Sequence, residues 1–289
     1  MRYFIDLAYR GAAYHGWQVQ PGVVTVQQTL EEALAKLLRR PTPIVGAGRT
    51  DAGVNARRMI AHVDLPDDFA PDTRFIHSLN SICGPDIAVR SFKAVKADAH
   101  ARFDAVERTY RYFVHTAKDP FLPPLSWQAP PTLDFEAMNH AAELLLGRRD
   151  FTSFSKLHTD VKTNICDLRE AMWHRIDDHR WYFEITADRF LRNMVRAVVG
   201  TLVDVGRHKI TGADLLDILA AKDRCAAGTS MPAEPLFLWD VKYPGDEVAP
   251  TRIHRQGWRE AFVSFSIEVE HTSYLPDHLD SEADEFVDL

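Results

Sequence analysis

The sequence has few of the features that mark exported, membrane-bound or disulfide-rich proteins. It holds only three cysteines, Cys83, Cys166 and Cys225, which lie far apart and fit no zinc-site spacing. No stretch approaches the ~20 consecutive apolar residues that a membrane-spanning helix needs, and the first residues contain no apolar export signal. We therefore expect a cytoplasmic protein without a membrane segment, with reduced and buried cysteines.

Common metal-binding and phosphate-binding motifs are also missing. The 13 histidines include no HExxH pair, so we expect no metal site. The glycines near residue 50 do not fit GxGxxG, because after Gly46 and Gly48 the third glycine is only at Gly53. No GxxxxGK[ST] sequence exists either. The glycines of this segment therefore serve something other than phosphate binding.

The net charge of −7 is distributed unevenly along the chain. Residues 246–289 hold 11 acidic residues and 3 arginines, which leaves a balance of about +1 for the first 245 residues. That first part contains clustered arginines at 39–40, 57–58 and 148–149, followed by Arg189, Arg192 and Arg196. Local basic patches, rather than the total charge, decide whether a protein binds nucleic acid. The alternative for any single pair is a solvated surface face.

Hydrophobic periodicity predicts alternating strands and helices, and hence an α+β protein with a largely antiparallel sheet. Thr25 and Gln28 predict an N-terminal cap for the first helix, and Gly147 predicts the end of the second. We place a boundary between two halves near residue 105, and expect an added strand or hairpin and a flexible acidic tail after residue 245. The predicted strands are 3–9, 59–65, 86–95, 108–115, 181–187 and 236–243, and the predicted helices are 25–38, 134–147 and 189–206.

The segment "GAGRTDAGV" at 46–54 places one carboxylate, Asp51, among three glycines and close to Arg49. Glycine permits positive φ and the close approach of another molecule. A carboxylate oriented by a nearby arginine could act as a nucleophile or a general base. Taken alone, however, the same residues also fit an ordinary surface turn with an Arg–Asp pair.

Several further motifs decide between these interpretations. "GRTDAGV" resembles the catalytic signature of tRNA pseudouridine synthases of the TruA type. The N-terminal "AAYHGWQVQPGVVTVQQTLEEAL", the strand "ERTYRYFV" and the segment "NMVRAVVGTLVDVG" resemble the same family, as do "DIAVRSF", "HARFDA", "DFTSF" and "AAKDR". The motifs occur in the family's order over roughly residues 1–245, which makes the resemblance far more specific than one loop.

The resemblance implies a role for individual residues. Asp51 is the expected catalytic residue, acting through either a covalent or a glycal-type intermediate, with no cofactor or metal. Tyr110 is expected to stack on the target base, whereas Tyr112 on the same strand face could be structural. Arg196 is expected to pair with Asp51. Arg49 is expected to grip the displaced nucleotide backbone or to help hold the nucleotide flipped, since a stem base must leave its stack before reaction.

The resemblance also implies the fold, the substrate and the assembly. The family's fold consists of two ferredoxin-like (RNP-like) halves around a mixed, mainly antiparallel sheet, here residues 1–104 and 105–245, with 246–289 as an extension. Its substrate is tRNA, at positions 38–40 of the anticodon stem-loop, and its members are homodimers. We expect phosphate contacts from the two arginine pairs Arg57, Arg58, Arg148 and Arg149.

The sequence departs from the family pattern at Asn55 and Asn193, where histidine is usual. Asparagine keeps a donor and an acceptor but does not titrate near pH 7, so we interpret both as supporting hydrogen-bonding positions. Two rival functions remain open: a non-catalytic RNA-binding protein with this fold, and a glycoside-cleaving enzyme. The second normally needs two carboxylates, and the 46–54 segment offers one.

Overall fold

A ten-stranded sheet forms the centre of the computed structural model, which describes residues 1–156 and 163–245. Its main strand order is β4-β1-β3-β10-β5-β9-β8-β7, while β2 pairs with β3 and β6 with β5. The pairings β10–β3 and β5–β6 are parallel, and the others are antiparallel. The strands are β1 (Arg2–Tyr9), β2 (Ile44–Gly46), β3 (Asn55–Asp64), β4 (Ile87–Ala94), β5 (Glu107–His115), β6 (Trp127–Gln128), β7 (Gly147–Asp150), β8 (Ile165–Arg175), β9 (Arg180–Ala187) and β10 (Leu236–Lys242). The predicted mixed, mainly antiparallel sheet is therefore confirmed.

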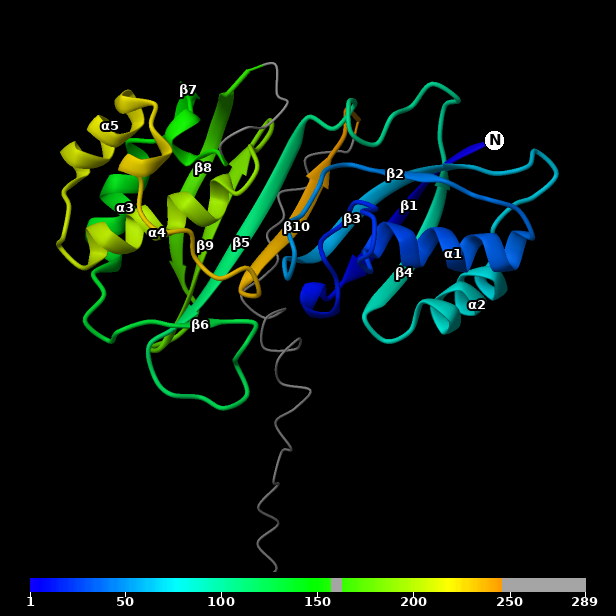
Figure 1. The fold of residues 1–289 in the computed structure, drawn as a ribbon, viewed down its shortest axis with the longest axis horizontal. Coiled ribbons are helices and arrows are strands. Elements are labelled where there is room, and N and C mark those ends of the chain that lie inside the picture. The colour runs from blue at the N-terminus through cyan, green and yellow to red at the C-terminus, as the bar shows by residue number, and fades with distance from the viewer. Residues whose placement is uncertain (157–162, 246–289) are drawn as a thin grey trace, which may run out of the picture. The chain divides into compact units, whose positions relative to one another are not determined.

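Strand β10 joins the two halves of the sequence into one sheet. It lies between β3 of the first half and β5 of the second (Figure 1). Leu238 is opposite Ala56 on one side and Tyr110 on the other. The site residues of the two halves are thereby brought to the middle of a continuous sheet.

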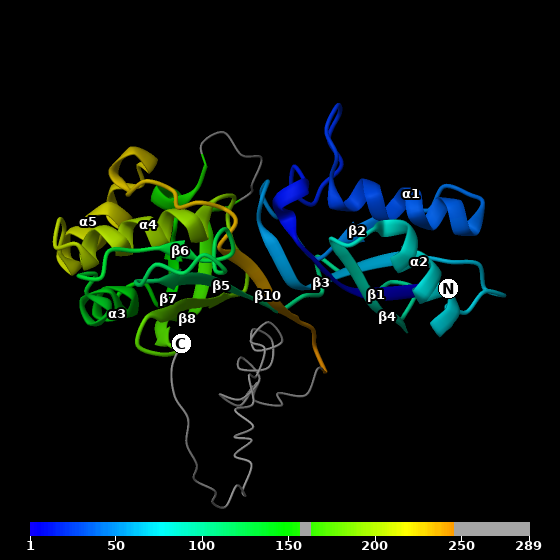
Figure 2. The same ribbon diagram turned by 90° about the horizontal axis from the view of Figure 1, so that it is seen from below.

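Five α-helices cover one face of this sheet in the described residues, with α1 and α4 above different halves (Figure 2). They are α1 (Val26–Leu38), α2 (Thr73–Cys83), α3 (Phe135–Glu143), α4 (Met194–Gly206) and α5 (Gly212–Ala221). Three short 3-10 helices are η1 (Gly11–Ala13), η2 (Thr152–Phe154) and η3 (Arg224–Ala226). The predicted start of α1 is confirmed, because the Thr25 side chain accepts a hydrogen bond from the Gln28 N–H.

The described part of the chain has one hydrophobic core in each half. Ile5 and Leu7 of β1 are buried together with Leu30 and Leu34 of α1 in the first core. The second core contains inward-facing residues of β9 and the apolar side of α4, including Phe183, Ile185, Val198 and Leu202. Tyr110 packs against both cores. The alternation of β1 and the helical spacing of α1 thus predict which side chains are buried. Helix α4, expected to be partly buried, is instead buried on almost all sides.

Two predicted helix boundaries are wrong. The helix expected over 134–147 ends at Glu143, and Gly147 begins β7 with a φ of 89°. The helix expected over 189–206 begins only at Met194, because Asn193 takes a left-handed conformation with a φ of 66°. Residues 188–193 are therefore a connection between β9 and α4, which changes the environment of Arg192.

Other expectations have mixed outcomes. Cys83 and Cys166 are buried as expected, but Cys225 is exposed. The added strand and the acidic tail were predicted for residues that lie outside the described part of the chain. Within residues 1–156 and 163–245, no helix combines the length and the apolar character needed to cross a membrane.

Candidate active site

Asp51 lies in the connection between β2 and β3, which contacts the N-terminal segment before α1. The hydroxyl of Tyr9 on β1 lies 2.7 Å from the Thr50 hydroxyl, and both are buried. The backbone N–H of Trp17 donates to the Thr50 carbonyl at 3.2 Å, and the N–H of Gly53 donates to the Tyr14 carbonyl at 3.3 Å. The residues on both sides of Asp51 are thus held, while its own side chain remains 29% exposed.

Crowding and backbone conformation explain most glycines near Asp51, although a Cβ at Gly48 would meet no atom within 4 Å. Gly16 has a φ of 86°, and a Cβ there would lie 2.4 Å from the Thr50 carbonyl oxygen. Gly53 has a φ of 80°, which other residues adopt only with strain. A Cβ at Gly46 would lie 2.5 Å from the Trp17 ring. Part of the N-terminal motif, "YHGW", therefore shapes the loop that presents Asp51.

Two arginines of the second half face the Asp51 carboxylate. Nε of Arg192 lies 3.8 Å from Oδ1, and Nη1 of Arg196 lies 4.0 Å from Oδ2. The expected pairing of Asp51 with Arg196 is confirmed. Arg49 is exposed and forms no ion pair with a described residue, so the neighbouring arginine suggested by the sequence is not the partner of Asp51.

The Arg196 side chain is oriented by the backbone of Met231. Its Nε donates to the Met231 carbonyl at 2.5 Å, and the Met231 N–H donates to the Arg196 carbonyl at 3.1 Å. The Asn193 amide donates to the Ser230 hydroxyl at 2.6 Å. These contacts leave Nη1 of Arg196 directed at Asp51. They also place Asn193 in a supporting position, as interpreted from the sequence.

Tyr110 lies on β5 at the junction of the two halves. Its ring meets Phe190 edge-to-face, with centroids 5.1 Å apart. Burial raises the pKa of Tyr110 above its ordinary range, the Arg108 guanidinium lowers it, and the Asp51 charge raises it further. The phenol is therefore neutral at pH 7. Tyr112 is completely buried and its hydroxyl has no hydrogen-bond partner among the described residues, which identifies it as a core residue.

Asn55 connects three segments below the Asp51 loop. Its side-chain oxygen accepts from the Gly11 N–H at 2.8 Å, and its amide donates to the Glu234 carbonyl at 2.6 Å and the Leu236 carbonyl at 3.5 Å. The side chain is buried, and all of these partners are backbone groups. Asn55 therefore supports the fold around the site and does not face Asp51 as an acid or base.

Comparisons with known proteins identify the family of this chain. A family model described as tRNA pseudouridine synthase matches residues 141–244. The tRNA pseudouridine synthase A of Parabacteroides distasonis is 55% identical over 249 residues, which are 86% of this chain and 98% of that relative. The chain belongs to the tRNA pseudouridine synthase A family. The enzyme of that name from Porphyromonas gingivalis is 53% identical over 85% of this chain and 98% of its own length, and that from Bacillus subtilis is 40% identical over 84% and 99%.

Membership of the tRNA pseudouridine synthase A family makes this chain an isomerase. Arg192 is the partner of Asp51 that the sequence analysis did not predict. The sequence included Arg192 only among clustered basic residues. Its spacing from Arg196 suggested a position on the same helix, whereas the two residues reach Asp51 from a connection and from α4. The apolar spacing of residues 189–206 did not predict the left-handed conformation of Asn193, which separates the two arginines.

The four expected RNA-backbone residues have different environments. Arg57, Arg148 and Arg149 are exposed. Arg58 donates to Asp6 at 2.9 Å and to Asp240 at 2.8 Å, so two carboxylates already neutralise its guanidinium. Asp6 alternates along β1 with the buried Ile5 and Leu7, which places Arg58 on the sheet face opposite the helices.

One other cluster of the described residues has metal-binding side chains. Ligand atoms of Glu170 and His174 on β8 and of Glu184 on β9 lie within 4.8 Å of one another. The Arg111 guanidinium donates to the Glu184 carboxylate. Because this positive charge already balances one carboxylate and would repel a cation, we assign the cluster to the charge balance of the sheet.

Proposed function

We propose that this protein converts uridine to pseudouridine at positions 38–40 of the tRNA anticodon stem-loop, with Asp51 as the catalytic residue. The observation that carries the proposal is the position of Asp51. Its carboxylate is partly exposed in a loop held by the first half, and it faces Arg192 and Arg196 of the second half. Family membership supports the reaction and its tRNA substrate.

The proposed reaction is an isomerisation, in which the atoms of uridine are rearranged without a second reactant. Pseudouridine formation breaks the bond from uracil N1 to ribose C1′ and forms a bond from C5 to the same carbon, while N1 gains the proton that C5 loses. Substrate and product have the same composition, so no oxidant, reductant or energy source enters. The Asp51 carboxylate would either attack the uridine or remove a ribose proton. The two guanidinium groups would balance its charge and fix its direction.

The residues around Asp51 are suited to bind a uracil that has been displaced from the stacked RNA stem. Tyr110 offers an aromatic ring at the junction of the two halves, where uracil would stack. Arg49 is exposed beside Asp51, and Arg192 is 58% exposed. Both can reach phosphates of the displaced nucleotide, whose removal from the stem costs a few kcal/mol.

We further propose that tRNA binds across a homodimer in the cytoplasm, as the family resemblance predicts. Arg57, Arg148 and Arg149 are exposed and available for phosphate contacts, whereas Arg58 is the weakest candidate because of its pairs with Asp6 and Asp240. Charge reversal at Arg148 and Arg149 should reduce tRNA affinity and the steepness of its salt dependence. Unchanged affinity and salt dependence would remove these residues from the proposed interface.

The test of the proposed reaction is a nucleotide-by-nucleotide map of pseudouridine in tRNA incubated with the protein. We expect product in the anticodon arm only. A transcript with cytidine at positions 38–40 should bind but yield none. Product elsewhere would overturn the proposed positions, and binding without any product would favour a non-catalytic RNA-binding protein.

A further inference from the structure

Arg108 of β5 binds four backbone carbonyl groups with one guanidinium. Its Nη1 donates to Ala105 at 2.9 Å and to Asp188 at 2.8 Å. Its Nη2 donates to Ala47 at 3.0 Å and to Arg102 at 2.6 Å. Among the described residues, no carboxylate lies within ion-pair distance of this guanidinium, so its hydrogen bonds are all with the main chain.

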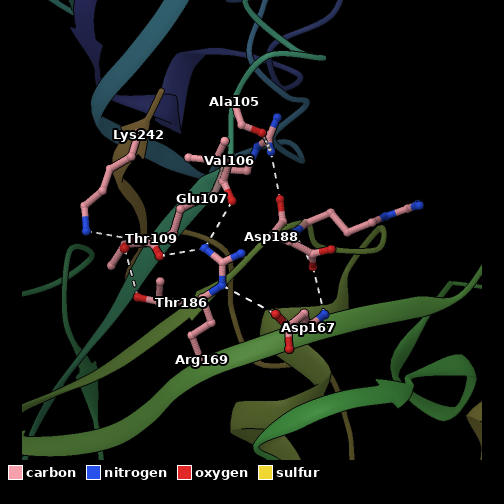
Figure 3. A network of polar contacts seen from close by, with 11 residues as sticks. Ala105, Val106, Glu107, Thr109, Asp167, Arg169, Thr186, Asp188 and Lys242 are labelled. Carbon is pink, nitrogen blue, oxygen red and sulfur yellow. Dashed lines mark hydrogen bonds and ion pairs between the residues drawn. The ribbon is translucent and has the colours of Figure 1, made fainter. Parts of the chain in front are cut away.

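Two of the four carbonyls, those of Ala47 and Asp188, belong to segments that form the candidate site. Ala47 begins the loop that carries Asp51. Asp188 begins the connection that carries Phe190 and Arg192 and leads into α4. Ala105 and Arg102 precede β5, and Figure 3 shows Ala105 and Val106 above Asp188 in this part of the sheet. One side chain therefore links both halves of the site.

The ion pairs of Asp51 are too long to perform this linkage themselves. They measure 3.8 and 4.0 Å between partly exposed groups, where attraction is weak and screened. The hydrogen bonds of Arg108 measure 2.6–3.0 Å and come from one rigid, planar group. The position of the Asp51 loop relative to residues 188–193 therefore depends more on the hydrogen bonds of Arg108 than on the ion pairs of Asp51.

We propose that Arg108 is a positioning residue for the isomerisation, which holds the Asp51 loop against the connection 188–193 so that Arg192 and Arg196 face the carboxylate. It touches no reacting atom. Lysine cannot replace it, because an ammonium group is a single point donor and cannot span four acceptors in one plane. This inference rests on the proposed function of Asp51.

The first test compares Arg108→Lys and Arg108→Gln with the wild-type protein in pseudouridine formation on a tRNA transcript. We expect kcat to fall about 10- to 100-fold, because small displacements of catalytic groups have effects of that size. KM and tRNA affinity should change by less than about threefold, since the RNA contacts remain. Rates are divided by the folded fraction from circular dichroism.

Arg169→Ala is the matched control. Arg169 lies in the neighbouring network of Figure 3, where it donates to Glu107 and to the Val106 carbonyl, but it contacts neither Ala47 nor Asp188. Its kcat should stay within about twofold of wild type. A folded Arg108→Lys variant that is equally active would overturn the positioning role. Unfolding of both Arg108 variants would assign Arg108 to the fold instead.

A double-mutant cycle with Arg192→Ala separates positioning from general destabilisation. If Arg108 places Arg192, the loss of kcat caused by Arg192→Ala should be several-fold smaller in the Arg108→Lys background than in wild type. Equal losses in both backgrounds would contradict the proposal. Absence of pseudouridine with the wild-type protein would instead overturn the proposed function, and the positioning role with it.

Discussion

Arg196 reaches the Asp51 carboxylate at 4.0 Å with Nη1, although the two residues belong to different halves of the chain. Its Nε is bonded to the Met231 carbonyl, and its side chain is 22% exposed. Arg192 reaches the other carboxylate oxygen but is 58% exposed and less constrained. The two arginines are therefore unequal: Arg196 is oriented by a backbone carbonyl, whereas the Arg192 side chain is more exposed.

This difference predicts unequal effects on activity. Arg196→Ala should lower kcat about 100-fold or more, since it removes a preorganised charge beside the carboxylate. Arg192→Ala should lower it about tenfold, and neither should change the free energy of unfolding by more than about 1–2 kcal/mol. Single-turnover rates and denaturant unfolding measure both effects. Arg175→Ala, which removes an exposed ion pair with Asp178, is the control and should keep the wild-type rate. A loss of kcat in Arg196→Ala no larger than that in Arg175→Ala would contradict the role assigned to Arg196.

Gly16 and Gly22 offer a matched test of the loop support. Both have positive φ, 86° and 78°, but only a Cβ at Gly16 would strike the Thr50 carbonyl, whereas nothing lies within 4 Å at Gly22. Gly22→Ala should cost about 1 kcal/mol from backbone strain alone. Gly16→Ala should cost about 3 kcal/mol and lower kcat in the folded protein. Equal stability and activity of the two variants would show that Gly16 does not shape the Asp51 loop.

Tyr110 and Tyr112 should respond differently to loss of the hydroxyl and of the ring. Tyr112→Phe should leave activity unchanged and keep or raise stability by about 1 kcal/mol, because its buried hydroxyl has no hydrogen-bond partner within residues 1–156 and 163–245. Tyr110→Ala should reduce kcat/KM at least tenfold by removing the stacking surface, and Tyr110→Phe should retain much more activity than Tyr110→Ala. If the two Tyr110 variants are equally impaired, stacking is not its main contribution.

The environment of His62 predicts that the folded protein loses stability in mild acid. Its Nδ1 accepts the Ala101 N–H at 3.1 Å, and burial, together with Arg2 and His100, lowers its pKa. The neutral form is thus favoured in the folded protein, while the unfolded chain takes up a proton near pH 6.5. Stability should be full above about pH 6.5 and decrease as the pH falls toward the lower folded pKa.

The measurement for His62 is the melting temperature between pH 7 and pH 5. His62→Gln keeps an acceptor for Ala101 but does not titrate, so its melting temperature should depend less on pH than that of the wild type. The exposed His77 of α2 provides the control variant His77→Gln, which should behave like wild type. An unchanged pH dependence in His62→Gln would contradict the assignment.

Much of the fold follows from local patterns in the sequence. Alternation in β1 and helical spacing in α1 predict both their type and their buried faces, because each element buries one side on a single core. The end of α3 and the start of α4 could not be predicted in this way. Leucines continue after Glu143, and arginines and apolar residues continue before Met194, so the pattern does not change where the helices end.

The motifs of the site and its Asp51–Arg196 pair could be predicted, but its other contacts could not. "GRTD" points to Asp51, and the resemblance pairs it with Arg196. The proximity of Arg49 in sequence suggested the wrong neighbour, because adjacent residues in an open loop need not point the same way. The position of Arg192 and the hydrogen bond from Arg108 to the Asp188 carbonyl depend on the path of residues 188–193. That path follows from the backbone conformation of Asn193 and from contacts between distant segments.

The most direct test of the central claim is Asp51→Asn, which keeps the size and polarity of the side chain but removes its charge. Pseudouridine in tRNA would be mapped for wild type, for Asp51→Asn and for Asp68→Asn, a control at an exposed aspartate. We predict unchanged tRNA binding for all three, with product from wild type and Asp68→Asn only. Product from Asp51→Asn at the wild-type rate would contradict the assignment of the catalytic residue.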